Sequence, residues 1–416
     1  MTMSFPNNEI NQGRRQFSAM AKPVGASCNL NCSYCYYLSK GNLPGMQGCE
    51  AIPDAILEKH IHDTLEGNQS SEVIFDWQGG EPTLLGIDFF KKVLRLQEQH
   101  CQPDKVVLNN LQTNGTLLNE DWCRFLRDNR FLVGLSLDGP KSLHDAYRRD
   151  KGGGPSFDRV MASVKLLKKM GVEFNTLTVL NRLNVKYPLD VYRFLTREVG
   201  PRMIQFIPLV EPRGFERTAP QHWDATQLPV VGSSAARPGT PDSIVCDWSA
   251  DPDDLGSFLC KVFDEWHRRD MGKYFVNFVE GAVAAWAGLP AQTCVFSKVC
   301  GKAVVLERDG AVYSCDHYVY PEYRLGNIQE KTLVEMVFSE RQTRFGLNKY
   351  DSLPSQCRNC QFLFACWGEC PRNRFVKTPD GEPGLNYFCP AFKRFFAHVD
   401  APLKTLIKAW QDPRRG

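Results

Sequence analysis

The first half of the chain alternates short apolar runs with longer amphipathic segments. In the longer segments apolar residues recur every three or four positions, which is typical of helices with one buried face. The short runs are rich in β-branched and aromatic residues and therefore predict strands. The six predicted strands are residues 17–23, 73–77, 105–113, 132–138, 173–180 and 203–209, and the helices expected between them include 53–66, 87–100 and 156–171.

This alternation of strands and helices predicts right-handed βαβ units that share a parallel sheet. Six such units give an α/β fold, an open partial (β/α)6 barrel resembling part of a TIM barrel. We assign residues 1–215 to this first domain. In such barrels the chemistry gathers at the carboxyl ends of the strands.

The pattern changes after Leu209. Residues 211–255 are rich in Pro, Gly, Ser and Thr, which predicts a long irregular excursion. A helical pattern follows over residues 254–272. We therefore assign residues 216–290 to the excursion and to helices that link it to the rest of the chain.

The last part of the chain is dense in cysteine, with eight of them between Cys294 and Cys389. Within it a β-hairpin is predicted to turn on Asp309 and Gly310, a dipeptide that favours tight hairpin turns. An amphipathic pattern near the C-terminus predicts a final helix. These features define an expected third domain, residues 291–416, which the cysteines organise.

Composition narrows the classes of function. Hydrophobic residues make up 43% of the 416 residues, and the net charge of +3 does not favour nucleic acid or a membrane surface as a partner. The chain contains no apolar run of about 18 residues, so no membrane-spanning helix is predicted. The first twenty residues are polar and lack a secretory signal core, so a cytoplasmic location is expected. In a reducing compartment, sixteen cysteines indicate metal sites rather than disulfides.

Three cysteines stand close together in the sequence CNLNCSYCYYL, directly after the first predicted strand. Cys28, Cys32 and Cys35 are one thiol short of a closed tetrahedral zinc site, and the nearby Cys49 has no second pair to complete one. A zinc knuckle or a set of buried thiols would be a purely structural explanation. Thiolates also bind iron–sulfur clusters, and three of them leave one iron of a cubane open to a small molecule.

The eight late cysteines allow two readings. Two zinc ribbons are one possibility. The other is a pair of fully ligated [4Fe–4S] clusters, for which eight thiols suffice without remainder. The remaining cysteines match neither pattern; Cys101, Cys123 and Cys260 fall in helical patterns and are expected to pack in the interior, while Cys246 lies in the excursion.

The C-x3-C-x2-C loop resembles that of the radical SAM superfamily. The segments WQGGEP (77–82), GLSLDGP (134–140) and QFIPL (205–209) resemble motifs of the same superfamily. The resemblance implies that the open iron of the first cluster binds S-adenosyl-L-methionine (SAM), whose reductive cleavage gives a 5′-deoxyadenosyl radical. It also implies a set of SAM contacts, namely Tyr34, Gly80, Ser136, Arg148 and Leu209.

The sequence CRNCQFLFACWGEC, with outlying cysteines on both sides, resembles the SPASM domain. That family carries two auxiliary [4Fe–4S] clusters whose ligands interleave along the chain. The resemblance assigns the first of them to Cys294, Cys300, Cys315 and Cys370. It assigns the second to Cys357, Cys360, Cys366 and Cys389.

Together with SCDHYVYPEYRLGNI (314–328), these motifs resemble the anaerobic sulfatase-maturating enzymes. Such enzymes oxidise a cysteine or serine of a nascent or unfolded sulfatase, within a C/S-x-P-x-R motif, to Cα-formylglycine. The resemblance makes Asp316 the base, although an aspartate after a strand is more often a solvated or turn-capping residue. It makes Gln78 and Tyr37 substrate contacts. It also implies an electron donor such as flavodoxin or ferredoxin.

Two rival functions remain at this point. A radical SAM/SPASM maturase that crosslinks a ribosomally made peptide would use the same three clusters, although many such enzymes begin with a peptide-binding domain for which residues 1–16 are too few. A non-catalytic zinc-binding adaptor would use the cysteines alone.

Overall fold

The computed structural model describes residues 15–42, 50–219 and 222–410. A ten-stranded sheet runs through it in the order β10-β9-β8-β1-β2-β3-β4-β5-β6-β7. The strands are β1 (Ser18–Lys22), β2 (Glu72–Trp77), β3 (Val106–Thr113), β4 (Leu132–Ser136), β5 (Phe174–Leu180), β6 (Met203–Pro208), β7 (Phe275–Val276), β8 (Ala303–Glu307), β9 (Ala311–Tyr313) and β10 (Arg324–Asn327).

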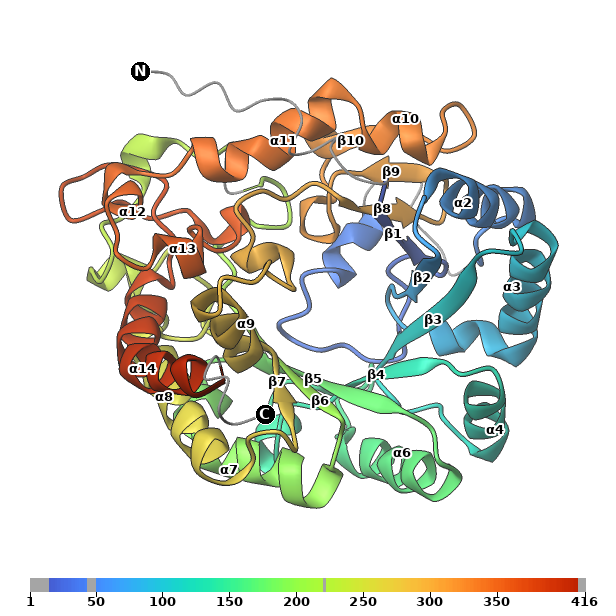
Figure 1. The fold of residues 1–416 in the computed structure, drawn as a ribbon, viewed down its shortest axis with the longest axis horizontal. Coiled ribbons are helices and arrows are strands. Elements are labelled where there is room, and N and C mark those ends of the chain that lie inside the picture. Colours follow the sequence, from blue (N-terminus) through green and yellow to red (C-terminus); the bar gives the residue numbers. More distant parts are fainter. Residues whose placement is uncertain (1–14, 43–49, 220–221, 411–416) are drawn as a thin grey trace.

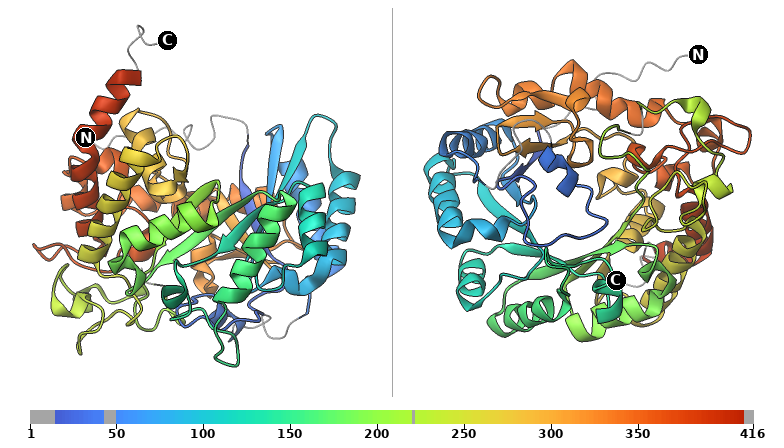
Figure 2. Two further views of the ribbon diagram at one scale, coloured as in Figure 1. Left: turned by 90° about the horizontal axis from the view of Figure 1, so that it is seen from below. Right: turned by 180° about the vertical axis from the view of Figure 1, so that it is seen from behind.

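Helices cover the outer side of this curved sheet, as the views in Figure 1 and Figure 2 show for α2, α3, α4, α6 and α7. The core lies between the two layers, where Phe75 and Trp77 of β2 and Phe90 of α3 are fully buried. The helices are α2 (Asp54–Gly67), α3 (Gly86–His100), α4 (Glu120–Asp128), α5 (Lys141–His144), α6 (Phe157–Met170), α7 (Pro188–Arg193), α8 (Pro252–Arg269), α9 (Asn277–Trp286), α10 (Leu333–Val337), α11 (Glu340–Asp351), α12 (Ser355–Arg358), α13 (Leu363–Cys366) and α14 (Cys389–Trp410).

The first half of the sequence folds as its pattern predicts. Along β5 every second side chain is buried, as expected of a strand with its two faces in different surroundings. Helix α4 begins where the side chain of Asn119 accepts a hydrogen bond from the backbone N–H of Trp122. Helix α6 ends at Gly171, whose φ of 69° is a left-handed conformation that glycine adopts freely. The six predicted strands and the three named helices are confirmed to within a residue or two.

Strands β1 to β6 are parallel neighbours, which confirms the predicted α/β sheet. The sheet is wider than predicted, because β7 adds to β6 and β8 adds in parallel to β1. The predicted hairpin is also confirmed, since β8 and β9 are antiparallel and Gly310 between them has a φ of 84°. Backbone hydrogen bonds thus join the hairpin of the cysteine-rich segment directly to the first strand of the barrel.

The described part of the segment after β6 is irregular, as predicted, and contains short 3₁₀ turns such as Ala225–Gln227 and Ser234–Ala236. An isolated bridge between Pro212 and Val245 joins two parts of the excursion, and one between Val230 and Lys377 joins it to the cysteine-rich segment, residues 291–416. Helices α8 and α14 follow the two predicted helical patterns. In the described part of the chain, none of the helices is long and apolar enough to span a membrane.

Candidate active site

The predicted site residues gather at one edge of the sheet. The cysteine loop follows β1, the glycine pair follows β2, and Ser136 is the last residue of β4. Because these strands are parallel, their carboxyl ends lie along the same edge, where barrel enzymes assemble their sites.

The first cysteine loop holds its three thiols near one another. Its backbone turns back on itself, since the N–H of Cys35 donates to the carbonyl of Cys32 at 3.0 Å and the N–H of Leu30 donates to the Sγ of Cys28 at 3.3 Å. Burial raises the pKa of Cys28 to about 11, and the charges of Glu81 and Cys35 add to this shift. Burial likewise raises the pKa of Cys32 to about 12, with contributions from Cys35 and Cys28. Bound iron would reverse these shifts, because a metal takes thiols as thiolates.

The glycine turn after β2 lies against this loop. The N–H of Gly80 donates to the carbonyl of Gly25 at 2.8 Å, and a Cβ on Gly80 would stand only 1.9 Å from the carbonyl oxygen of Ser27. Gly79 has a φ of 138°, which favours glycine as well. The close approach of the two loops explains why both residues lack a side chain.

Two polar side chains that the sequence analysis missed fix this turn. Glu81 is fully buried and accepts hydrogen bonds from the hydroxyl of Thr113 at 2.7 Å and from the backbone N–H of Asn114 at 2.7 Å. The side-chain amide of Asn114 in turn reaches the Sγ of Cys28 at 3.7 Å. The end of β3 therefore supports both the glycine turn and the first cysteine. The signal in the sequence was the position of Glu81 directly after the glycine pair, inside the GGEP motif.

Two of the predicted SAM contacts meet at a buried carboxylate. Asp138 is fully buried, accepts a hydrogen bond from the hydroxyl of Tyr34 and pairs with the guanidinium of Arg148 at 2.9 Å. Arg148 also lies over the ring of Tyr34, 5.5 Å from its centroid. Burial raises the pKa of Tyr34 well above its usual value, so its hydroxyl remains a donor. Asp138 was missed by the sequence analysis although it lies inside the GLSLDGP motif.

The other predicted SAM contacts lie along the same edge. The hydroxyl of Ser136 accepts a hydrogen bond from the side-chain amide of Gln112 at 3.0 Å. Leu209, directly after β6, is buried, and its N–H donates to the carbonyl of Leu180.

The four cysteines assigned to the first auxiliary cluster, Cys294, Cys300, Cys315 and Cys370, lie close enough for their charges to interact. Burial raises the pKa of Cys315 well above its usual value, and the charges of Cys370 and Cys294 raise it further. Burial raises the pKa of Cys300 to about 11, and the charge of Cys294 contributes to this shift. The ammonium of Lys349 donates to the backbone carbonyl of Cys294 at 2.7 Å and holds the segment in place.

The other four late cysteines line a cavity of about 300 Å³, together with aromatic side chains such as Phe362 and Phe392. The four are Cys357, Cys360, Cys366 and Cys389. The two groups are the same two sets that the resemblance to SPASM domains assigns. Three thiols in the first loop and four in each late group are the donors that one open and two fully ligated [4Fe–4S] clusters need.

The unassigned cysteines stand apart from these groups. Cys123 and Cys260 are buried within α4 and α8, and Cys101 is half-buried after α3. Cys246 is buried in the excursion. Cys49 lies outside the described residues.

Asp316 follows Cys315 and points toward the first cysteine loop. Its carboxylate forms an ion pair with the ammonium of Lys22 at 2.6 Å and accepts a hydrogen bond from the hydroxyl of Tyr36 at 2.5 Å. Burial alone would raise the pKa of Asp316, but the charge of Lys22, the neighbouring His317 and these hydrogen bonds lower it to about 2. The carboxylate is therefore ionised at neutral pH, as a proton acceptor must be.

The two predicted substrate contacts share Lys22 with Asp316. The side-chain oxygen of Gln78 accepts a hydrogen bond from the ammonium of Lys22 at 3.3 Å. The same ammonium lies 4.4 Å from the centroid of the Tyr37 ring, and the hydroxyl of Tyr37 donates to Glu307 at 2.6 Å. Three residues picked out by separate motifs thus surround one buried lysine. Lys22 and Glu307 were missed because neither belongs to a motif.

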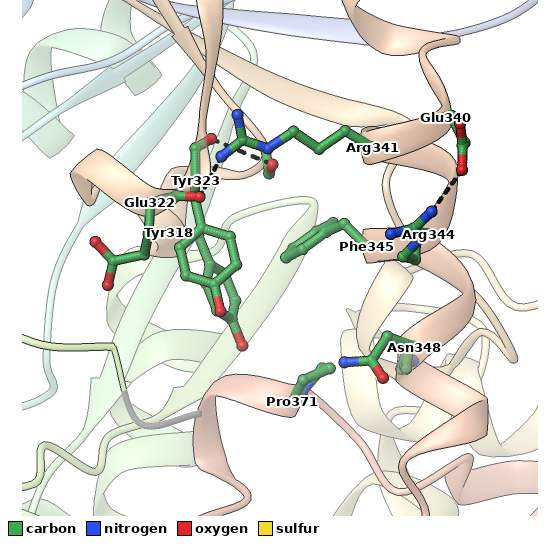
Figure 3. A pocket seen from close by; sticks show the side chains of 11 residues that line it. Tyr318, Glu322, Tyr323, Glu340, Arg341, Arg344, Phe345, Asn348 and Pro371 are labelled. Carbon is green, nitrogen blue, oxygen red and sulfur yellow. Dashed lines mark hydrogen bonds and ion pairs between the residues drawn. The ribbon is translucent and has the colours of Figure 1, made fainter. Parts of the chain in front are cut away.

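A larger cavity, of about 560 Å³, lies beside the first late cysteine group rather than at the sheet edge. Figure 3 shows its aromatic side chains, Tyr318, Tyr323 and Phe345, with Arg341 above them. Arg341 is engaged, because its guanidinium donates to the backbone carbonyl of Glu322. None of the predicted site residues lines this cavity.

Comparison with known proteins places this site in a family. Residues 23–195 match the Radical SAM superfamily, and residues 294–361 match the SPASM iron–sulfur cluster-binding domain. The serine-type anaerobic sulfatase-maturating enzyme of Bacteroides thetaiotaomicron is 46% identical to this chain over 389 residues, which cover 94% of this chain and 90% of that protein. The cysteine-type anaerobic sulfatase-maturating enzyme of Clostridium novyi is 32% identical, over 92% of this chain and 95% of its own length.

A solved structure, native anSMEcpe with bound AdoMet and Cp18Cys peptide, has the same fold. The match has a TM-score of 0.79 and 30% identity, and it covers 95% of this chain and 99% of that chain.

The fold and the grouped cysteines, with these two domain matches, define a radical SAM protein that carries a SPASM domain. Within that class the chain belongs to the family of anaerobic sulfatase-maturating enzymes, which it resembles over almost its whole length. This membership favours sulfatase maturation over peptide crosslinking and over a zinc-binding adaptor.

The contact between the glycine turn and the cysteine loop yields a first prediction. Gly80→Ala should push the loop away, because its Cβ would lie 1.9 Å from a backbone oxygen. Reconstituted protein should then hold about eight irons instead of about twelve, since only the first cluster is disturbed. The matched control is Gly152→Ala, whose Cβ would meet Asp150 at an ordinary 3.4 Å and should leave the iron content unchanged. Full iron content and normal SAM binding in Gly80→Ala would contradict this account.

A second prediction concerns the independence of the three thiol groups. Replacing Cys28, Cys32 and Cys35 together with Ala should leave about eight irons per chain, because the two late groups keep all their ligands. Iron quantitation of the anaerobically reconstituted, folded protein checks this. Complete loss of iron from a folded triple variant would show that the groups are not independent.

Proposed function

We propose that this protein is a radical SAM dehydrogenase that oxidises a cysteine or serine side chain of a sulfatase to Cα-formylglycine. The observation that carries the proposal is the hydrogen bond between Tyr36 and Asp316. These residues directly follow Cys35 and Cys315, one in each of two cysteine groups. A proton acceptor thereby stands beside the loop expected to hold the open cluster, which is what a two-electron oxidation of a side chain needs.

The number and type of the grouped thiols fit the proposed cofactors. Cys28, Cys32 and Cys35 would hold the first [4Fe–4S] cluster, and the two late groups would hold the auxiliary clusters. SAM would lie against Tyr34, Gly80, Ser136, Arg148 and Leu209. When bound, SAM and the first cluster supply the 5′-deoxyadenosyl radical that removes a hydrogen atom from the substrate Cβ.

The chain's own part in the reaction is to hold the substrate and to accept a proton. Asp316 is proposed to take the proton from the hydroxyl or thiol of the substrate residue after the hydrogen atom has left Cβ, and an auxiliary cluster would accept the remaining electron. A serine would give the aldehyde directly, whereas the thioaldehyde from a cysteine would exchange its sulfur for the oxygen of water and release hydrogen sulfide. The side chain of Asp316 is only 21% exposed, so bulk water competes weakly for the same proton. Gln78 and Tyr37, on either side of Lys22, are proposed to contact the substrate peptide near the target residue.

The proposal extends to partners and organisation. The substrate would be a nascent or unfolded sulfatase polypeptide carrying the C/S-x-P-x-R motif, and the peptide in the related solved structure supports a polypeptide ligand. Flavodoxin or ferredoxin would supply electrons in the cytoplasm, where thiols stay reduced. Residues 1–215 would form the SAM-binding core, residues 216–290 the excursion and linking helices, and residues 291–416 the domain with the auxiliary clusters.

The role of Asp316 gives the third prediction. Asp316→Asn keeps the shape of the side chain and leaves an amide oxygen for Lys22, but it removes the proton acceptor. Formylglycine formation should fall by about 10²–10⁴-fold, the usual contribution of a positioned general base. Cleavage of SAM to 5′-deoxyadenosine and the iron content should be retained. Mass spectrometry of a sulfatase-like peptide, alongside chromatography of deoxyadenosine, measures both.

The control for this variant is Asp158→Asn, which alters an exposed aspartate paired with Lys141 and should leave all readouts unchanged. Separate peptides with serine and with cysteine at the target position would also establish which residue is oxidised. Unchanged formylglycine formation by Asp316→Asn with its clusters intact would remove Asp316 from the mechanism.

A further inference from the structure

Three neighbouring strands present polar side chains at their carboxyl ends. Lys22 is the last residue of β1, and its Cα is paired in register with that of Glu307, the last residue of β8. On the other side, Gln78 directly follows β2, and its N–H donates to the carbonyl of Ala21 at 2.9 Å. Sheet pairing therefore fixes where these three side chains begin.

Lys22 is the central member of this row and is almost completely buried, with 2% of its side chain exposed. A buried ammonium is strongly unfavourable unless charged or polar partners surround it. Here the partners are the carboxylate of Asp316 at 2.6 Å, the amide oxygen of Gln78 at 3.3 Å and the face of the Tyr37 ring. Each of these contacts joins Lys22 to a residue already assigned to the site.

The carboxylate of Glu307, beside Lys22, has a different partner. One oxygen of Glu307 accepts the hydroxyl hydrogen of Tyr37 at 2.6 Å, and the other has no hydrogen-bond partner among the described residues. Burial raises the pKa of Glu307 to about 7, although Tyr37 and the charge of Lys22 oppose the shift. The close ion pair of Lys22 in the structure is with the carboxylate of Asp316.

We propose that Lys22 is a positioning residue for the oxidation, which fixes the carboxylate of Asp316 next to Gln78 through the ion pair at the end of β1. The inference rests on the proposed role of Asp316 as the proton acceptor. In it the proton passes from the substrate hydroxyl or thiol to Asp316, and Lys22 itself neither gains nor loses one. Lys22 touches no part of the substrate, because its ammonium is enclosed by its partners.

A double-mutant cycle tests this directly, because a residue that acts through Asp316 has nothing to position once the carboxylate is gone. Lys22→Met keeps the length of the side chain and removes its charge. In the otherwise unchanged protein it should lower kcat for formylglycine by about 10²-fold, the cost of misplacing a catalytic group by about an ångström. The KM for the peptide should change little. In the Asp316→Asn background the same substitution should cost less than about threefold.

Two further readouts separate positioning from loss of structure. Iron content and SAM cleavage should persist in Lys22→Met, so that deoxyadenosine accumulates in excess of formylglycine. The control is Lys169→Met, which breaks an exposed ion pair with Glu120 and should change nothing. If Lys22→Met fails to fold, the cycle is run with Lys22→Gln, which keeps a hydrogen-bond donor, and the same non-additivity between the substitutions at the two sites is expected.

The outcomes distinguish this inference from the function on which it rests. Equal losses from the Lys22 substitution in both backgrounds would overturn the inference and leave the proposed base in place. A parallel rise in KM would also overturn it, since it would show direct contact with the substrate. Unchanged activity of Asp316→Asn alone would instead contradict the proposed base.

Discussion

The ion pair between Lys22 and Asp316 joins the two halves of the site. Lys22 ends the first strand of the barrel, whereas Asp316 follows the hairpin of the cysteine-rich segment. Leaving one partner of a buried pair without the other costs about 3–5 kcal/mol, somewhat less here because Asp316 is partly exposed. Parallel pairing of β8 with β1 joins the β8–β9 hairpin to the barrel, and Asp316 follows β9, the returning strand of that hairpin. Through the ion pair the barrel and the cysteine-rich segment build one site.

Much of the fold could be predicted because the first half of the chain has strong local patterns. Alternation along β5 and the apolar stripes of α3 and α6 are decided by residues near in sequence. The place of β8 could not be predicted in the same way. Its sequence indicates a hairpin with β9, but its second neighbour, β1, lies far away in the chain. Which edge of a sheet receives a hairpin depends on tertiary packing, which a local pattern does not record.

The candidate site was predictable to the extent that its residues form motifs. Spacing identified the cysteines, and the close approach of the loops gives a physical reason for Gly80. Asp138, Lys22 and Glu307 were missed because each is a charged residue in or next to a strand, where polarity usually indicates exposure. Their burial is possible only because partners arrive from other strands and loops. Buried charged residues of this kind can be assigned to the site only once their contacts in the folded chain are known.

The central claim is that this site removes a hydrogen atom from the Cβ of a sulfatase serine or cysteine and so begins its oxidation. The most direct measurement uses a sulfatase-like peptide that carries deuterium at the Cβ of its target residue, incubated anaerobically with the reconstituted protein, SAM and a reductant. The account predicts deuterium in the 5′-deoxyadenosine that forms, together with formylglycine in the peptide. Deoxyadenosine free of deuterium, or deuterium transfer that yields a crosslinked peptide instead of formylglycine, would contradict it.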